Sequence, residues 1–236
     1  MRRMTIVLMI TLGITVCVTG KEKKQKPWTE WSLKEAQKML DDSPWGQTQV
    51  ETDTSEMYWT PTTSSSASRA SRGALNQATP ANFRIRFLSA KPIRQAFARS
   101  IELQQKTPDK QLSDSLHSFV ERKFDEWIVV AVTYDSRDQR FSGDAMQAFN
   151  SAVTSTLQNN TYLETKDGKK NFLREYKPPI NDGLGAKFIF PRTVEGRPFV
   201  TPESGELRFY CQFAQSVTLN MRFKIADMMY QGNLEY

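Results

Sequence analysis

The sequence has few of the side chains from which most active sites are built. Its 236 residues include one histidine, His117, and two cysteines, Cys17 and Cys211. No pair of histidines or cysteines has the spacing of a zinc site, and there is no phosphate loop and no serine nucleophile elbow. The catalytic motifs that a sequence can reveal are therefore excluded, and we expect neither a metal nor a cofactor.

The sequence also lacks an apolar run long enough to cross a bilayer. Its longest apolar run, Thr5–Val18, has about 14 residues, whereas a spanning helix needs about 20. Two arginines precede this run and the lysine-rich stretch 21–26 follows it, which is the pattern of a secretory leader. The pattern predicts an exported protein of the periplasm or cell envelope, with a signal peptide at 1–20 and a basic tether at 21–31.

Two ways of processing the leader remain open. The small residues Thr19 and Gly20 suit an ordinary signal peptidase, whereas Ile14-Thr15-Val16-Cys17 is similar to a lipobox. Val16 stands where such a motif usually has Gly, Ala or Ser, and lipidation of Cys17 would make the chain a lipid-anchored envelope lipoprotein. If the leader is cleaved after Gly20, an internal disulfide is not expected, since Cys211 is then the only cysteine left.

The charge balance excludes one class of partner. Lys and Arg number 32 against 26 Asp and Glu, but the two signs alternate along most of the chain. A nucleic-acid-binding protein concentrates its basic residues on one face. The only basic cluster is the tether, so we expect no nucleic acid among the partners.

Residues 32–160 are predicted to be helix-rich with some strand. Ser32 and Glu35 form a capping box before a short apolar period, which predicts a helix at 32–40. The stretch 60–82 is rich in Ser, Thr and Ala without an apolar period, so it is expected to be a flexible loop. It is flanked by apparent strands at 57–59 and 83–88, as at the tip of a hairpin. Apolar periodicity predicts the other elements, which are helices beginning near Pro92 and at 109–125 and 144–157, and a central strand at 127–132.

From residue 161 onward the pattern is nearly all strand. Alternating apolar residues predict strands at 162–165, 172–176, 188–190, 207–213 and 217–225. The expected fold class is α+β, with a C-terminal antiparallel β-meander or half sandwich at 161–236. We expect this part to pack as one body with the preceding residues.

Three polar residues are the candidates for catalysis. Asp135 follows the central strand, Asp138 is three residues further on, and strand ends of this kind often hold metal-binding carboxylates. Together with His117 they would suit a periplasmic hydrolase or metal-dependent enzyme. Arg137, however, stands where an adhesion-type metal motif needs a hydroxyl. The alternative is a polar loop in which Asp135 pairs with a neighbouring arginine at the surface.

Aromatic residues near the tether are the candidates for binding. Trp28, Trp31 and Trp45 flank the first predicted helix, and aromatic anchors dominate the energetics of many interfaces. The alternative is that they fasten this helix to the body. Cys211 alternates with apolar residues and is expected to be a small buried side chain rather than a nucleophile.

Three stretches carry a resemblance to a known group. The segment PWTEWSLKEAQKMLDDSPWGQT, the segment FRIRFLSAKP at 83–92 and the ending ADMMYQGNLEY at 226–236 resemble an uncharacterised family of exported bacterial proteins. This resemblance implies export and no activity. We therefore predict a non-catalytic envelope protein that binds an envelope protein or a glycan, or that has a structural role.

Overall fold

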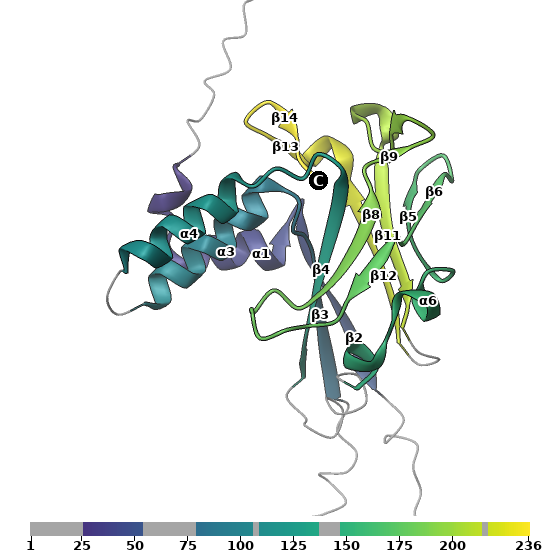
Figure 1. Ribbon diagram of the computed structural model, residues 1–236, viewed down its shortest axis with the longest axis horizontal. Helices are drawn as coiled ribbons and strands as arrows, with labels where there is room; N and C mark the ends of the chain where they lie inside the picture. The colour runs from purple at the N-terminus through teal and green to yellow at the C-terminus, as the bar shows by residue number, and fades with distance from the viewer. Residues whose placement is uncertain (1–25, 54–78, 106–108, 137–146, 214–216) are drawn as a thin grey trace, which may run out of the picture.

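Two antiparallel sheets face each other in the computed structural model, and a layer of helices covers the far side of one of them (Figure 1). The structure describes residues 26–53, 79–105, 109–136, 147–213 and 217–236. The architecture is α+β, as predicted. The order of layers is helices, six-stranded sheet, four-stranded sheet.

The six-stranded sheet has strands from both halves of the chain. Its order is β1 (Asp42–Ser43), β2 (Gly46–Asp53), β3 (Thr79–Phe87), β4 (Trp127–Ser136), β8 (Ala186–Pro191) and β7 (Glu175–Lys177). The four-stranded sheet has the order β12 (Thr218–Lys224), β11 (Glu206–Gln212), β5 (Thr161–Thr165) and β6 (Lys170–Phe172). The C-terminal residues therefore form one sheet and complete the other.

The helices begin where the sequence supplies a cap. In α1 (Leu33–Asp41), Ser32 accepts the N–H of Glu35 while Glu35 accepts the N–H of Ser32, which is the predicted capping box. A proline lies in the first turn of α3 (Lys91–Gln104), and Asp109 caps α4 (Lys110–Glu121). The remaining short helical segments are η1 (Trp28–Glu30), α6 (Thr154–Leu157), η3 (Pro202–Ser204) and η4 (Ile225–Asp227).

Helix α1 lies very close to the six-stranded sheet at Gly46. A Cβ atom at this position would collide with the backbone carbonyl of Leu40 and would also crowd Ile93 of α3. Only glycine lets the helix carbonyl approach the strand backbone this closely. Gly46 therefore fixes the position of α1 on the sheet.

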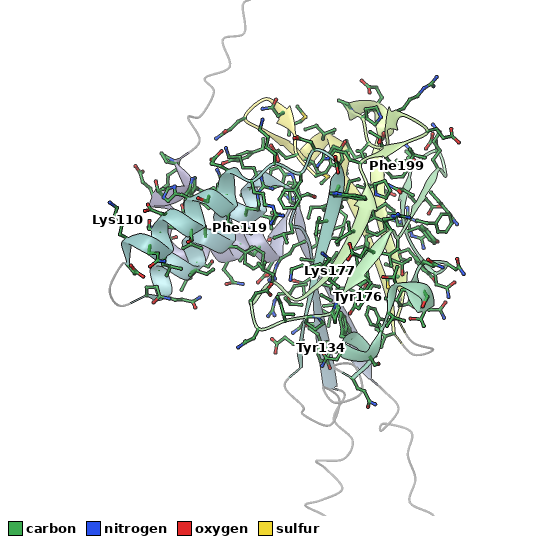
Figure 2. All side chains as sticks on the ribbon, viewed as in Figure 1. Lys110, Phe119, Tyr134, Tyr176, Lys177 and Phe199 are labelled. Carbon is green, nitrogen blue, oxygen red and sulfur yellow. The ribbon has the colours of Figure 1, made fainter. Side chains whose placement is uncertain are left out.

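One hydrophobic core joins the two sheets. Alternate residues of β3 and β11 point into it, and Ile85, Phe87, Leu207 and Phe209 are each fully buried. Phe188 of β8 lies in the middle. Its ring centroid is 5.3 Å from that of Phe209 across the sandwich. Figure 2 shows side chains filling this space, with Tyr134 and Tyr176 toward the α6 end and Phe199 toward the β9 end.

The last residues of the chain are held against several elements. Trp45 donates its indole N–H to the carbonyl of Glu235 at 2.8 Å, and the Glu235 carboxylate accepts the backbone N–H of Lys91 at 2.8 Å. Arg192 donates to the carbonyl of Tyr236 and lies over its ring. This C-terminal clamp caps the start of α3. Two small hairpins precede residues 235 and 236 in the sequence: β9–β10 (Thr193–Val194, Arg197–Pro198) and β13–β14 (Met229–Tyr230, Asn233–Leu234).

Most predicted elements are confirmed. The strand predicted at 83–88 pairs with a preceding strand, as in the expected hairpin, but that preceding strand includes residues 46–53. Strand β2 was not predicted, although it pairs with β3 from Gly46↔Arg86 to Asp53↔Thr79. Residues 79–82 belong to β3 and not to the predicted loop 60–82. The predicted strand 57–59 and the rest of that loop lie outside the described residues.

Two further predicted elements are interrupted. In place of one helix at 144–157, residues 147–151 are helical, Ala152 and Val153 are not, and α6 follows; the start of that prediction lies outside the described residues. Val153 is 51% exposed, so it does not line the predicted apolar stripe. The predicted strand 172–176 is divided between β6 and β7, which belong to different sheets. The chain crosses from one sheet to the other here, which a single alternating pattern does not reveal.

Candidate functional site

Asp135 lies near the end of β4 and is engaged by an arginine. Its carboxylate is 3.1 Å from the guanidinium of Arg84, and its side chain is 52% exposed. Asp138 lies outside the described residues. Asp135 is thus in a surface ion pair with Arg84 of β3. The arginines expected to pair with it, Arg137 and Arg140, lie outside the described residues.

Arg84 belongs to a network at the junction of α1 and the six-stranded sheet. Its Nε is 3.6 Å from Asp41, which also accepts a 2.6 Å hydrogen bond from Arg86. Arg86 is 5% exposed and donates to the carbonyl of Leu40 and the hydroxyl of Thr133. Burial lowers the pKa of Arg86, and the hydrogen bond and charge of Asp41 oppose this effect. These contacts join α1 to the sheet and leave no carboxylate pair for acid–base chemistry at Asp41.

His117 lies on the exposed side of α4 and contacts a tryptophan. Its ring centroid is 5.0 Å from that of Trp28 in η1. Asp135 lies in β4, and its described partner is Arg84. The structure shows no contact between His117 and Asp135. Among the described residues, no group of three or more His, Cys, Asp and Glu side chains is arranged to hold a metal ion.

The three tryptophans do not form one exposed surface. Trp31 and Trp45 are 8% and 4% exposed, and both belong to the core. The carbonyl of Trp31 accepts a 2.8 Å hydrogen bond from Arg99 of α3, and Trp45 belongs to the C-terminal clamp. Trp28 alone is partly exposed. The rings thus fasten the first helical segments to the body.

Cys211 is fully buried on the inner face of β11. Its sulfur lies 3.1 Å from the hydroxyl of Thr161, and burial raises the pKa of the thiol to about 12. A thiol with this pKa stays protonated at neutral pH, so it is not a nucleophile. Cys17 lies outside the described residues.

The outer face of the four-stranded sheet carries a row of aromatic rings. The register places Phe172, Tyr162 and Tyr210 side by side on β6, β5 and β11. The rings of Tyr162 and Tyr210 stack with centroids 5.0 Å apart, and that of Phe172 meets Tyr162 edge-on at 5.8 Å. Phe172 is 49% exposed. Helices α1, α3 and α4 cover the outer face of the other sheet, whereas none of these three helices covers this face (Figure 1).

A second row of charged side chains runs beside the rings. Lys170, Glu164, Arg208 and Arg222 are paired in register across the four strands. Arg208 contacts Glu164 at 3.0 Å, and its guanidinium lies 5.1 Å from the centre of the Tyr210 ring. The ammonium of Lys170 lies 4.3 Å from the centre of the Tyr162 ring. We refer to the two rows together, Phe172, Tyr162, Tyr210, Lys170, Glu164, Arg208 and Arg222, as the Tyr–Arg face.

The Tyr–Arg face has the composition of a binding surface. Tyrosine, phenylalanine and arginine are enriched at protein interfaces, and tyrosine and arginine are frequent hot spots. The cation–ring and ring–ring contacts hold these side chains in place, so little entropy would be lost when a partner contacts them. Such cross-strand pairs also stabilise the sheet, by about 0.2–1 kcal/mol each.

The sequence contained a signal for this face that we did not use. Tyr162 and Tyr210 occupy the solvent-facing positions of two predicted strands, so the sequence places two large aromatic rings on an outer face. Only the pairing of β5 with β11 brings these two residues together. That pairing is not visible in a single sequence.

The described residues contain no helix long and apolar enough to span a membrane. Comparison with known proteins gives no further guide to function, because no protein family model, no curated protein and no solved structure matches the chain. The resemblance to exported bacterial proteins therefore stays a prediction.

Proposed function

We propose that this chain is an exported protein of the bacterial cell envelope that acts by binding a partner protein through the Tyr–Arg face. The observation that carries the proposal is the aromatic row flanked by fixed cations on the uncovered sheet. A partner would bury Phe172, whose ring is half exposed, and would meet the edges of Tyr162 and Tyr210. Aromatic and arginine anchors of this kind account for most of the binding energy at measured interfaces.

The position of the N-terminal segment supports the same proposal. Trp28 lies against α4, in the helix layer, and the four-stranded sheet is the layer farthest from it (Figure 1). If residues 21–31 act as a tether, the Tyr–Arg face points away from the point of attachment. A partner could then reach this face whether the chain is soluble in the periplasm or anchored through Cys17.

Site-specific crosslinking tests this function. A photoreactive phenylalanine analogue placed at Phe172 should crosslink one discrete partner in living bacterial cells, since the analogue preserves the ring. The matched control is the same analogue at Ile180, which is 66% exposed in the connection between β7 and β8. Gel mobility and mass spectrometry of the adducts give the readout.

The expected adduct at Phe172 should fall at least tenfold when Arg208 is also replaced by alanine, because Arg208 orders Glu164 and Tyr210. Equal adducts at Phe172 and Ile180, or an adduct at Phe172 that Arg208→Ala leaves unchanged, would contradict the proposal. Crosslinks to saccharide alone would favour a glycan as the partner instead of a protein.

The proposed export has its own measurement. Intact mass and N-terminal peptide analysis of the protein from bacterial cells should show that the first residues have been removed. An acylated N-terminal cysteine at Cys17 would establish the lipoprotein form, and a new terminus at Lys21 would establish the soluble form. Recovery of the whole chain from cytosol, with Met1 retained, would rule out both.

A further inference from the structure

Strand β12 is an edge of the four-stranded sheet, and half of that edge is already occupied. The side-chain amide of Gln49, from β2 of the other sheet, donates to the carbonyl of Thr218 at 2.8 Å and accepts the N–H of Asn220 at 2.8 Å. A single side chain thus makes the pair of hydrogen bonds that a neighbouring strand would make. Edge strands that are satisfied in this way are protected from pairing with other chains.

The second half of the edge is open. Backbone groups alternate in direction along a strand, so the N–H and C=O of Arg222 and the N–H of Lys224 point the same way as those of Asn220. None of the described residues forms a hydrogen bond with these groups of Arg222 and Lys224. Both residues are exposed.

A groove runs along this open part of β12. Its volume is about 550 Å³, which is within the range of ligand-binding clefts. One wall is β12 with the adjoining η4, and the other is the α1–β2 connection. The groove is lined by Asp41, Asp42, Ser43, Pro44, Gln47, Thr48, Arg222, Lys224 and Asp227.

We propose that this groove binds an extended segment of a partner protein, which adds to β12 as a further strand and places acidic side chains beside Arg222 and Lys224. The exposed backbone groups provide the hydrogen bonds for strand addition. Side chains opposite each other on paired strands are neighbours, so the two cations favour carboxylates at alternate positions. Arg222 is already 2.8 Å from the carboxylate of Glu206, so a carboxylate of the partner would share it with Glu206. Asp41, Asp42 and Asp227 also line the groove, and of these Asp41 is paired with Arg86, so a segment that is acidic at every position is disfavoured.

This inference does not depend on the Tyr–Arg face as the main binding surface. Arg222 is the one residue that the face and the groove share. A partner could use either alone. Variants of the aromatic row therefore test the proposed function, and variants of the β12 edge test the inference.

The decisive variants change one position in two ways. Arg222→Pro removes the edge N–H together with the charge, whereas Arg222→Thr removes the charge and keeps the N–H. Proline is tolerated on an edge strand where its nitrogen faces outward. The probe is a short fluorescent peptide of alternating threonine and glutamate, with a threonine–lysine peptide as its charge-reversed control, titrated against the full chain by fluorescence anisotropy.

The threonine–glutamate peptide should bind at least tenfold more tightly than the threonine–lysine peptide. Arg222→Thr should weaken its binding by about fivefold, because one exposed charge contact is lost. Arg222→Pro should weaken it at least tenfold more than that, because a backbone hydrogen bond is also lost. Absence of binding by the wild-type chain, or equal binding to both variants, would overturn the proposal.

Amide hydrogen exchange of the wild-type chain tests strand addition to β12 even if Arg222→Pro does not fold. In the free wild-type chain the amide of Asn220 should exchange at least tenfold more slowly than those of Arg222 and Lys224, since only Asn220 is bonded to Gln49. The peptide should slow the Arg222 and Lys224 amides to a similar degree. Protection of these amides without peptide, together with a dimer in sedimentation, would assign the edge to a second copy of the chain and would overturn the peptide proposal.

Discussion

Replacing Phe188 by alanine is expected to lower the free energy of unfolding by about 4 kcal/mol, which is typical of removing a large buried ring. Phe188 is fully buried, and its ring contacts those of Tyr176, Phe209 and Phe213. The strand that carries it belongs to the six-stranded sheet, whereas Phe209 belongs to the four-stranded sheet. The substitution should therefore destabilise both sheets of the sandwich.

Urea unfolding followed by two probes checks this expectation. Tryptophan fluorescence reports the N-terminal part, because all five tryptophans precede residue 161, and labelling of the buried thiol of Cys211 reports the C-terminal part. Both transitions should move together in Phe188→Ala. The control is Phe172→Ala, which removes the same ring from an exposed position and should cost about 1 kcal/mol or less. Two separated transitions in the wild-type chain would show that residues 161–236 unfold independently.

Removing the carboxylate of Asp41 is expected to cost about 3 kcal/mol, because it would leave a buried guanidinium without its counter-charge. The side chain of Arg86 is 6% exposed and lies 2.6 Å from Asp41. After Asp41→Ala, that guanidinium would retain only neutral acceptors, the carbonyl of Leu40 and the hydroxyl of Thr133. Chemical denaturation of the variant measures the loss.

Asp135→Ala is the matched control, since Asp135 is half exposed and pairs with Arg84 at the surface. Its cost should be about 1 kcal/mol or less. The double variant Asp41→Ala/Arg86→Met should recover part of the stability, because methionine removes the buried charge. An Asp41→Ala variant no less stable than Asp135→Ala would mean that water reaches Arg86.

Elements with a strong local signal were predictable from the sequence. The capping box at Ser32 marked the start of α1, and the apolar run at 127–132 marked a central strand that β3 and β8 flank. Alternation in 217–225 predicted β12, in which Leu219 and Phe223 are buried and Met221 is partly buried. In each case the local pattern and the tertiary environment favour the same structure.

The strand β2 could not be predicted because it is held by pairing and not by its own apolar residues. Its one aliphatic side chain, Val50, is 58% exposed. The side-chain amide of Gln49 donates a hydrogen bond to the carbonyl of Thr218, which is 169 residues away in sequence. Such a role depends on how the sheets meet, which propensity and periodicity do not encode.

The candidate site could not be predicted from the sequence for a related reason. The polar residues that stand out in the sequence, Asp135 and His117, contact Arg84 and Trp28 and not each other. The Tyr–Arg face is assembled from four strands, and three of them contribute one aromatic ring each. A single sequence identifies the solvent-facing positions but not which of them become neighbours.

The C-terminal clamp has a consequence for how the protein matures. Its contacts join residues far apart along the chain: Trp45 with Glu235 across 190 positions, and Lys91 with Glu235 across 144. Long-range contacts form slowly, because a large loop must close first. A chain that emerges N-terminus first, from a ribosome or a translocation pore, cannot cap α3 until the segment around Glu235 has followed. The start of α3 is therefore expected to be among the last parts of the body to be fixed.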